Sequence, residues 1–378
     1  MTQPNVTLTR TDSEDLARGA CVLGVGGGGL PALGLELLYE DLTVGRTLNL
    51  IQVADIADDA MTCCAWGMGS IAPKDAAERE RQLTDLGVPP DRTARHMARA
   101  IRELEAVTGR NVDVLIPFEP GGRVMPSVLS AASELGIAMS DGDYSGRAVP
   151  ELNQIIPSIA GHSPCPAVAA DQYGNVSCLL NSVSNPMAER IGKHLAMAAF
   201  GSVAMAGFLL TGREARELIV AGTVSRAISV GRAIREARKS SHDPVVAAAR
   251  AVDGEIVFSG QLCRRDWTDD NGYMYGTMFL RDGAGKEMSI WFKNENHIAN
   301  LDGTTIATSP DLISVVDGDT GEPYTNAHPE MKDGRHLAVI VSSAPERLTK
   351  ADALKFHSPR WYGHDIEYAP FEFKKVSQ

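Results

Sequence analysis

The first half of the chain alternates short apolar runs with longer amphipathic stretches, and this alternation restricts the possible folds more than any other feature. Short runs rich in β-branched residues are typical of buried strands, whereas apolar residues recurring every three or four positions are typical of helices. The expected strands are 20–25, 48–56, 112–119 and 137–141, and the expected helices are 31–41, 75–109 with a break near residue 87, and 125–135. This order predicts an α/β layered domain with a largely parallel sheet.

The pattern changes in the second half of the chain. Residues 167–180 predict two strands around a Tyr-Gly-Asn turn, and helical stretches follow over 185–210 and 223–238. From about residue 252, short strands and turn signals recur, which is typical of an antiparallel barrel or sandwich. We therefore expect an α/β/α sandwich domain over residues 1–240 and a smaller, mostly antiparallel β-barrel domain over 241–378, with a tail that packs back on the first domain.

Charge and hydropathy exclude several classes of partner. The formal net charge is −12, without a block of like charge, so a nucleic acid backbone would meet mostly repulsion. No apolar run is long enough for a membrane span, and the first twenty residues lack a secretory signal pattern. We expect a cytoplasmic protein that binds neither nucleic acid nor membrane, with its six cysteines reduced.

The stretch GVGGGGLPALG at 24–34 places four consecutive glycines before an apolar, helix-like run. Gly24, Gly26 and Gly29 match the dinucleotide pattern G-x-G-x-x-G, with Asp55 as the acid for the ribose. A nucleotide is not favoured, because the preceding strand is very short and Asp55 lies later than the usual spacing of about 20 residues.

Two other interpretations of this glycine loop remain open. The glycines can allow a tight turn and close helix packing. Alternatively, their N–H groups can form a nest at a helix N-terminus that binds a small anionic or carbonyl group. The residues of such a nest are Gly26, Gly27, Gly28, Gly29 and Leu30.

Acidic side chains follow two of the expected strands. Glu119 leaves the strand 112–119 into a Gly-Gly turn, and Asp141 ends the strand 137–141. Ligands of parallel sheets bind beyond the carboxyl ends of the strands. Glu119 is therefore either a site carboxylate or an acceptor for backbone N–H groups in its own turn.

The segment SDGDYSGRAVPEL at 140–152 gathers three carboxylates and an arginine. Carboxylates this close can hold a divalent cation or share protons for acid–base catalysis, although a polar turn has the same pattern. Arg147 can clamp a substrate carboxylate or form a structural ion pair. His162, close to Cys165 in a Pro-rich loop, is a further candidate metal ligand.

Polar residues also end an apolar strand in the second domain, in WFKNENHIANLDG at 291–303. Asn294 and Glu295 stand at that strand end. Amide groups there can recognise a polar heterocycle or cap a turn.

Six motifs occur together and in order: GVGGGGLP, LIPFEPGG, DGDYSGRAVPEL, NENHIA, TSPDLISVVDGDTGEP and WYGHDIEYAPF. Through them the chain resembles the S-methyl-thiohydantoin desulfurase-like family, associated with hydantoin utilisation, over about residues 15–372. The resemblance implies an α/β/α sandwich joined to a β-barrel. It assigns the polar site to Glu119, Asp141, Asp143, Arg147, Glu151, Asn294 and Glu295.

The resemblance also implies attack on the C–S bond of a five-membered thiohydantoin ring. Asp141 or Asp143 would be the base or a ligand of a divalent metal ion such as zinc, with Glu119 as partner. Glu151 and His162 would complete a metal site, and Arg147 would hold a substrate carboxylate. At Leu30 many relatives carry a polar residue, often aspartate, which makes this position a candidate for substrate choice.

The resulting hypothesis is hydrolytic desulfurisation of a small, anionic heterocycle by a homo-oligomeric enzyme. Two other classes remain open. One is a nucleotide-dependent enzyme that uses the glycine loop. The other is a non-catalytic partner subunit of a ring-opening hydrolase of the hydantoin type.

Overall fold

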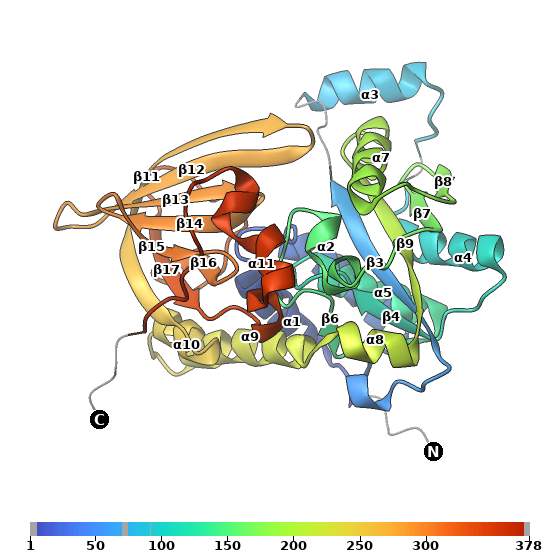
Figure 1. The fold of residues 1–378 in the computed structure, drawn as a ribbon, viewed down its shortest axis with the longest axis horizontal. Coiled ribbons are helices and arrows are strands. Elements are labelled where there is room, and N and C mark those ends of the chain that lie inside the picture. Colours follow the sequence, from blue (N-terminus) through green and yellow to red (C-terminus); the bar gives the residue numbers. More distant parts are fainter. Residues whose placement is uncertain (1–5, 70–74, 91, 374–378) are drawn as a thin grey trace.

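The computed structural model describes residues 6–69, 75–90 and 92–373, which form two parts lying side by side (Figure 1). One part is a large sheet with helices, and the other is a curled antiparallel sheet. Helices α9 (Thr223–Lys239) and α10 (Pro244–Ala251) run beneath them. The mixed α/β class and the two-part layout agree with the prediction.

The larger sheet has eight strands in the order β1-β2-β5-β4-β3-β9-β7-β8. Its neighbours β2, β5, β4 and β3 run parallel, whereas the outer pairs are antiparallel. The prediction of a largely parallel sheet is therefore wrong for the outer strands. The strands are β1 (Val6–Thr7), β2 (Asn49–Ile51), β3 (Met61–Gly69), β4 (Val114–Pro117), β5 (Ala138–Ser140), β7 (Ala167–Ala170), β8 (Val176–Leu179) and β9 (Ser202–Thr211).

Strand β3 contributes to a separate core on each face of the sheet, because side chains alternate along a strand. Cys63 and Ala65 belong to one core, together with residues of helices α1, α4 and α5. Cys64 and Trp66 belong to the other core, together with residues of α7. The helices are α1 (Arg10–Leu23), α2 (Pro31–Thr43), α3 (Ala76–Asp85), α4 (His96–Thr108), α5 (Val124–Leu135), α6 (Ile156–Ile159), α7 (Asn185–Ala198) and α8 (Gly212–Leu218).

Two predicted elements differ from the structure. Residues 20–23 end helix α1, which a capping box at Thr9 starts, so the expected strand 20–25 does not form. The expected helix 185–210 ends at Ala198, and Phe200 and Gly201 adopt positive φ before strand β9. Strand β9 is buried on both faces, and a continuous apolar run gives no periodicity that separates strand from helix.

The second sheet has the order β15-β14-β13-β12-β11-β17-β16, and all of its pairs are antiparallel. It curls until β14 contacts β16, but β15 and β16 are not neighbours in the hydrogen-bonded order, so it forms a half-barrel. The strands are β11 (Glu255–Asp270), β12 (Tyr273–Arg281), β13 (Glu287–Lys293), β14 (Glu295–Leu301), β15 (Thr304–Thr308), β16 (Leu312–Asp317) and β17 (His336–Ser342). A two-stranded pair joins β6 (Gly142–Asp143) and β10 (Val220–Ala221).

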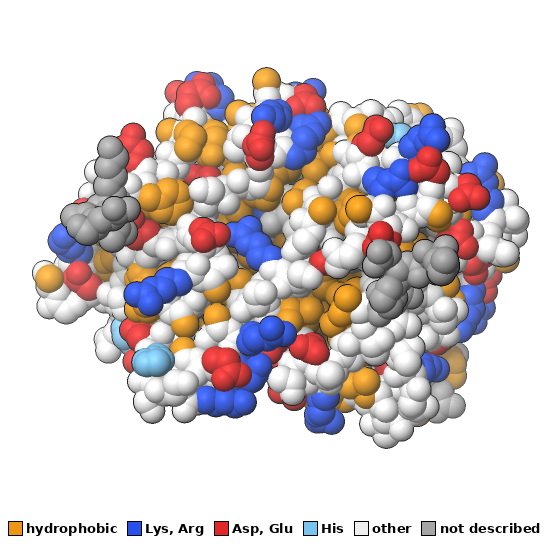
Figure 2. Space-filling model, turned by 90° about the horizontal axis from the view of Figure 1, so that it is seen from below, with side chains coloured by type: hydrophobic (Ala, Val, Ile, Leu, Met, Phe, Trp, Pro, Cys, Tyr) orange, Lys and Arg blue, Asp and Glu red, His pale blue; other side chains and the backbone are white. Residues whose placement is uncertain are grey.

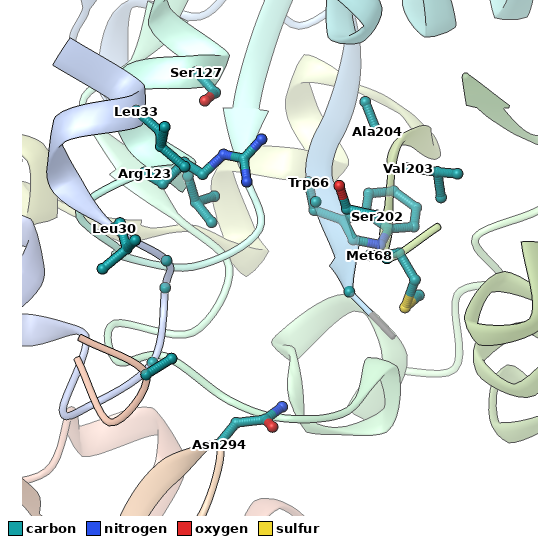
Figure 3. Close-up of a pocket in the computed structure, with 18 of the residues that line it drawn as sticks. Leu30, Leu33, Trp66, Met68, Arg123, Ser127, Ser202, Val203, Ala204 and Asn294 are labelled. Atoms are coloured by element: carbon teal, nitrogen blue, oxygen red, sulfur yellow. The ribbon is translucent and has the colours of Figure 1, made fainter. Parts of the chain in front are cut away.

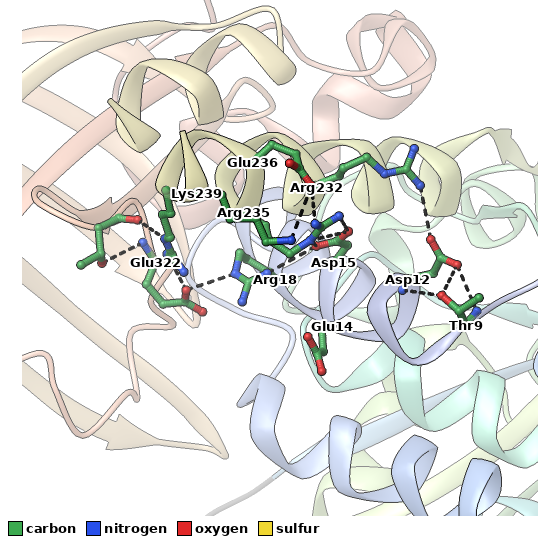
Figure 4. A network of polar contacts seen from close by, with 12 residues as sticks. Thr9, Asp12, Glu14, Asp15, Arg18, Arg232, Arg235, Glu236, Lys239 and Glu322 are labelled. Atoms are coloured by element: carbon green, nitrogen blue, oxygen red, sulfur yellow. Dashed lines mark hydrogen bonds and ion pairs between the residues drawn. The ribbon is translucent and has the colours of Figure 1, made fainter. Parts of the chain in front are cut away.

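Helices α1 and α9 pack closely through glycine. A Cβ on Gly19 would lie 1.8 Å from the Ala227 carbonyl oxygen, so a larger residue would force the helices apart. Charged groups line the same contact, where Arg235 pairs with the buried Asp15 at 2.9 Å (Figure 4). Glu322, between β16 and β17, accepts from Arg18 of α1 and Arg238 of α9, so the network ties both helices to the second sheet.

The chain after β17 returns to the first part through α11 (Ala351–His357). Gln154 Nε2 donates to the Phe356 carbonyl oxygen at 2.7 Å and to the Tyr362 hydroxyl at 2.6 Å. Figure 2 shows one face of the molecule, where acidic and basic side chains are interspersed with apolar ones. Among the helices of the described ranges, none is long and apolar enough to cross a membrane.

Candidate functional site

A cavity of about 880 Å³ is lined by residues of both parts of the molecule. The first part contributes the glycine loop, the end of β3 and the turn after β4, and the second contributes the β11–β12 hairpin and the start of β14. Figure 3 shows Leu33 and Arg123 on one side, with Trp66 and Met68 facing them and Asn294 below.

The glycine loop forms one wall of the cavity and packs against Glu295 and against the turn that follows Glu119. A Cβ on Gly27 would lie 1.9 Å from Glu295 Oε1. Gly28 has a φ of +71°, and its Cβ would lie 2.3 Å from the Cα of Gly121, two residues after Glu119. The Gly28 N–H finds no acceptor within the described part of the chain and stays available to a ligand. The close packing and the positive φ at Gly28 therefore require glycine here.

The structure does not place this loop in a dinucleotide-binding context. Such a loop joins a strand to a helix, whereas here helix α1 precedes it. Asp55, the proposed ribose acid, lies in a short 3-10 helix (Val53–Asp55) and does not line the cavity. The geometry gives the nucleotide-dependent alternative no support.

Leu30 lines the cavity and is also the N-cap of α2, where it makes no side-chain capping bond. An aspartate at an N-cap position accepts from free backbone N–H groups of the first turn. The polar residue expected here in relatives therefore has a capping role available to it, besides any contact with substrate.

Glu119 and Glu295 both line the cavity and both are buried, at 8 % and 3 % exposure. The turn after β4 carries Glu119, whose Oε2 accepts from the Val149 N–H at 2.7 Å. Glu295 begins β14, and its Oε2 has no hydrogen-bond partner in the described chain. An unpartnered buried carboxyl oxygen on a cavity wall is a group that a ligand can satisfy.

Burial raises the pKa of both carboxyl groups. The pKa of Glu295 is raised to about 8, although nearby Arg147, Lys193 and Lys293 oppose the shift. Burial, followed by the charge of Glu295, raises the pKa of Glu119 well above its ordinary value. Since two adjacent carboxylates resist being ionised together, the pair retains a proton near neutral pH.

We expect this pair to make stability depend on pH. The Glu295 pKa is about 8 in the folded state against an ordinary value of 4.5, so between these values the folded protein binds more protons than the unfolded chain. Its contribution to the free energy of unfolding therefore falls as pH rises, by up to about 1.4 kcal/mol per unit. Glu295→Gln removes this contribution. Urea denaturation at pH 5 to 8 should show the stability of the variant increasing relative to wild type as pH rises, and parallel curves would contradict the assignment.

Four cationic side chains of the first part line the cavity: Arg79, Arg95, Arg123 and Lys193. Arg123, at the start of α5, forms no ion pair with the residues that the structure describes, and burial lowers its pKa. Its charge also lowers the pKa of His96, after burial, so these two groups lie near each other. Lys193 of α7 donates to the carbonyl oxygens of Gly69 and Gly272, at 3.0 and 3.2 Å. Arg123, beside the turn that carries Glu119, is thus a cation that can bind an anionic group.

Arg147, the predicted carboxylate clamp, has no exposed surface and does not line the cavity. Its guanidinium donates to the carbonyl oxygens of Ala148, Asp311 and Asn296, at 3.1, 3.0 and 3.1 Å. Because Asn296 follows Glu295, Arg147 holds the start of β14 in place. A clamping role for Arg147 does not fit this geometry, since the guanidinium is fully buried away from the cavity and donates to backbone carbonyl oxygens.

Asp141 and Asp143 also lie outside the cavity lining. Asp141 accepts from the Ser225 N–H at 2.8 Å and its hydroxyl at 2.6 Å, which caps the N-terminus of α9. One oxygen of Asp143 accepts from the N–H groups of Ser145 and Gly146, at 2.7 and 2.6 Å. Both carboxylates thus accept from nearby backbone N–H groups, while the second oxygen of Asp143 has no hydrogen-bond partner in the described chain.

Asp141→Ala is expected to destabilise the protein by about 2 kcal/mol, because α9 loses its cap and its favourable N-terminal charge. The kcat of the folded variant should stay within twofold of wild type. Thermal denaturation and a rate measured well below the melting temperature test this. A large loss of kcat without a loss of stability would show that Asp141 has a catalytic role and not only a structural one.

The four predicted metal ligands are not brought together. Asp141 and Asp143 are engaged as described, while Glu151 pairs with Lys293 and accepts from Trp361 Nε1 at 3.2 Å. His162 lies in the loop after α6 and does not line the cavity. Across residues 6–69, 75–90 and 92–373, no group of three or more His, Cys, Asp and Glu side chains is placed to hold a metal ion. These residues therefore do not fit one shared metal site.

Asn294 lines the cavity as predicted, in a left-handed conformation with φ +56°. Its side-chain oxygen accepts from the Met274 N–H at 2.9 Å, and its carbonyl oxygen accepts from Asn326 Nδ2 at 2.7 Å. Asn294 thus shapes the turn before Glu295, and both interpretations of this amide, turn cap and cavity contact, are compatible with its position.

Sequence reasoning missed Arg123, Lys193 and Trp66 as cavity residues. Arg123 directly follows the Gly-Gly turn after Glu119, so its position in the motif was a usable signal. Lys193 and Trp66 carry no such signal, because each lies in an ordinary helix or strand pattern. Only the tertiary fold brings them to the cavity.

Two domain models of one protein family match this chain over most of its length. The models for the N-terminal and C-terminal domains of the S-Me-THD-like family match residues 11–181 and 183–371. The crystal structure of a protein from Chromobacterium violaceum is 22% identical, with a TM-score of 0.74, and the match covers 97% of this chain and 100% of that one. At this identity the likeness shows the fold alone. Among functionally curated proteins, no significant match is found. By the two domain matches, the chain belongs to the S-Me-THD-like family.

Proposed function

We propose that this protein removes sulfur hydrolytically from a small five-membered thiohydantoin-type ring. The observation that carries the proposal is the pair of buried carboxyls, Glu119 and Glu295, on one cavity beside bare backbone N–H groups. Membership of the S-Me-THD-like family supports the substrate class.

The Glu119–Glu295 pair is suited to moving protons. A pair that keeps one proton near neutral pH offers a carboxylate that accepts a proton from water and a carboxylic acid that donates one to sulfur. The Gly28 N–H, on the same wall, can stabilise the negative charge that develops on the ring. In this proposal the site contains a base, an acid and a hydrogen-bond donor that stabilises the developing anion.

The reaction balances without an oxidant or reductant. The oxygen of water bonds to the thioxo carbon, the C–S bond breaks, and sulfur leaves with both water protons as hydrogen sulfide. With an S-methylated ring, one proton leaves on methanethiol and the other remains on the ring nitrogen. In both cases the C–S unit becomes a ring carbonyl.

Other cavity residues would position the ring. Trp66 and Met68 line the wall opposite Arg123 and would contact one edge of the ring. Arg123 would bind an anionic ring substituent through its fork of donors. In this proposal Arg123 takes the role that the sequence assigned to Arg147.

The test is sulfur release by the purified chain alone. A panel of 2-thiohydantoins and S-methyl-thiohydantoins, with and without a carboxylate side chain, would be incubated with the protein and assayed for sulfide and methanethiol. We expect catalytic release of one of them. Release only after a ring-opening hydrolase is added would instead favour the partner-subunit role, and no release in either assay would overturn the proposal.

A further inference from the structure

Trp66 presents a buried, unused hydrogen-bond donor. Its side chain lines the cavity and is 3 % exposed, and its Nε1–H has no acceptor among the described residues. Buried N–H groups are almost always paired in native proteins, so an unpaired one on a cavity wall points to a ligand acceptor. Glu295 Oε2, a carboxyl oxygen on the same cavity, is likewise unpartnered within the described chain.

The protein holds this indole in a fixed position. Phe118 and Phe208 pack against it, with ring centroids 5.7 and 6.1 Å away. Met68, two residues along β3, lies on the same face of the strand and in the same core. Neither aromatic neighbour offers the indole N–H a conventional acceptor.

The chemistry of the surrounding wall favours one kind of acceptor. Met68 and Val203 line the cavity with Trp66, and Figure 3 shows them on the side opposite Arg123. A carbonyl oxygen buried against such apolar side chains would lose strong hydrogen bonds to water. A thioxo sulfur is a larger, more polarisable and weaker acceptor, so the N–H donor in this mostly apolar wall, where the Ser202 hydroxyl is the nearby polar group, suits it.

We infer that the Trp66 Nε1–H donates a hydrogen bond to the exocyclic sulfur of the ring, and that Trp66, Met68 and Val203 form the subsite from which the sulfur departs. The identity of the ligand rests on the proposed function. The indole transfers no proton in this scheme, because both protons on the departing hydrogen sulfide come from water by way of the glutamate pair.

Calorimetric binding of three ring probes tests the subsite without requiring turnover. The probes are 2-thiohydantoin, hydantoin, which has oxygen in place of sulfur, and imidazolidin-4-one, which has no exocyclic atom at that carbon. We expect wild type to bind 2-thiohydantoin about 10-fold more tightly than hydantoin. Trp66→Phe, which keeps an aromatic ring but lacks the donor, should lower the affinity for 2-thiohydantoin about 5-fold.

The controls separate the donor from general packing. Trp66→Phe should leave the affinity for imidazolidin-4-one unchanged, and Trp291→Phe, the same change on β13 outside the cavity lining, should alter no affinity. An unchanged affinity of Trp66→Phe for 2-thiohydantoin, or an equal loss for imidazolidin-4-one, would overturn the inference. Equal binding of hydantoin and 2-thiohydantoin to wild type would overturn it as well.

Failure of the proposed function gives a different result. Wild type would then bind 2-thiohydantoin with the expected dependence on Trp66 but release neither sulfide nor methanethiol from any ring. A wild type that binds no probe would overturn the subsite, even if another ring in the panel is turned over.

Discussion

The Glu295→Gln variant is expected to release sulfur about 10³-fold more slowly than wild type, because glutamine can neither accept nor donate the proton that the glutamate pair shares. The substitution keeps the size of the side chain, which packs against Gly27. It also removes a group whose pKa burial raises to about 8, so the fold should be retained. Initial rates of sulfide release at pH 7, together with thermal denaturation, measure both effects.

Two further variants make this result specific. Glu119→Gln should reduce the rate by a similar factor, and the double variant should be little worse than either single one, because residues that act as a unit are not additive. Glu217→Gln, an exposed glutamate on α8, is the matched control and should retain the wild-type rate. A Glu295→Gln variant with more than a tenth of the wild-type rate would rule out the pair as the proton-transfer group.

The Arg123→Met variant is expected to raise KM about 50-fold for rings that carry a carboxylate, with a smaller effect on kcat. Arg123 has no ion-pair partner among the described residues, so the substrate anion would supply one, and a charged hydrogen bond contributes about 2 kcal/mol or more. Methionine preserves the apolar stem that packs against Gly29. Steady-state kinetics on paired substrates with and without the carboxylate measure the effect.

The paired substrates are the internal control for Arg123. Arg123→Met should bind the neutral ring as wild type does, because the neutral ring never uses the guanidinium. Arg110→Met, a change of an exposed arginine in the loop before β4, should leave both substrates unaffected. Equal KM increases for charged and neutral rings would show that Arg123 supports the cavity wall and does not bind an anion.

Sequence patterns predicted the local elements where periodicity was strong. The expected helices 31–41, 125–135 and 223–238 correspond to α2, α5 and α9. The prediction failed for 20–25 and 202–211, where a run buried on all sides has no period that distinguishes strand from helix. The order of the strands could not be predicted from the sequence either, because β9 lies between β3 and β7 although it is far from β3 along the chain.

The candidate site, too, could be predicted from the sequence only in part. Glu119, the glycine loop and Glu295 could be found from the sequence, because each directly follows or precedes an apolar strand or helix run. Asp141 and Asp143 have the same kind of position, yet neither lines the cavity, and one oxygen of each accepts from backbone N–H groups, of α9 and of a turn. Whether a carboxylate at a strand end faces a cavity or caps a neighbouring element depends on tertiary packing, which no local pattern contains.

The insertion of β9 also has a consequence for how the chain folds during synthesis. Strands β2 to β5 emerge from the ribosome early, but β3 also pairs with β9, residues 202–211. Strand β9 pairs in turn with β7, and β7 with β8. The large sheet therefore cannot be completed until the chain has been synthesised well past residue 181, where the first family domain ends. Until then the nascent chain carries an open strand edge. The two family domains are therefore units of sequence and not of folding. The glutamate pair takes one residue from each domain, so it forms only in the completed chain.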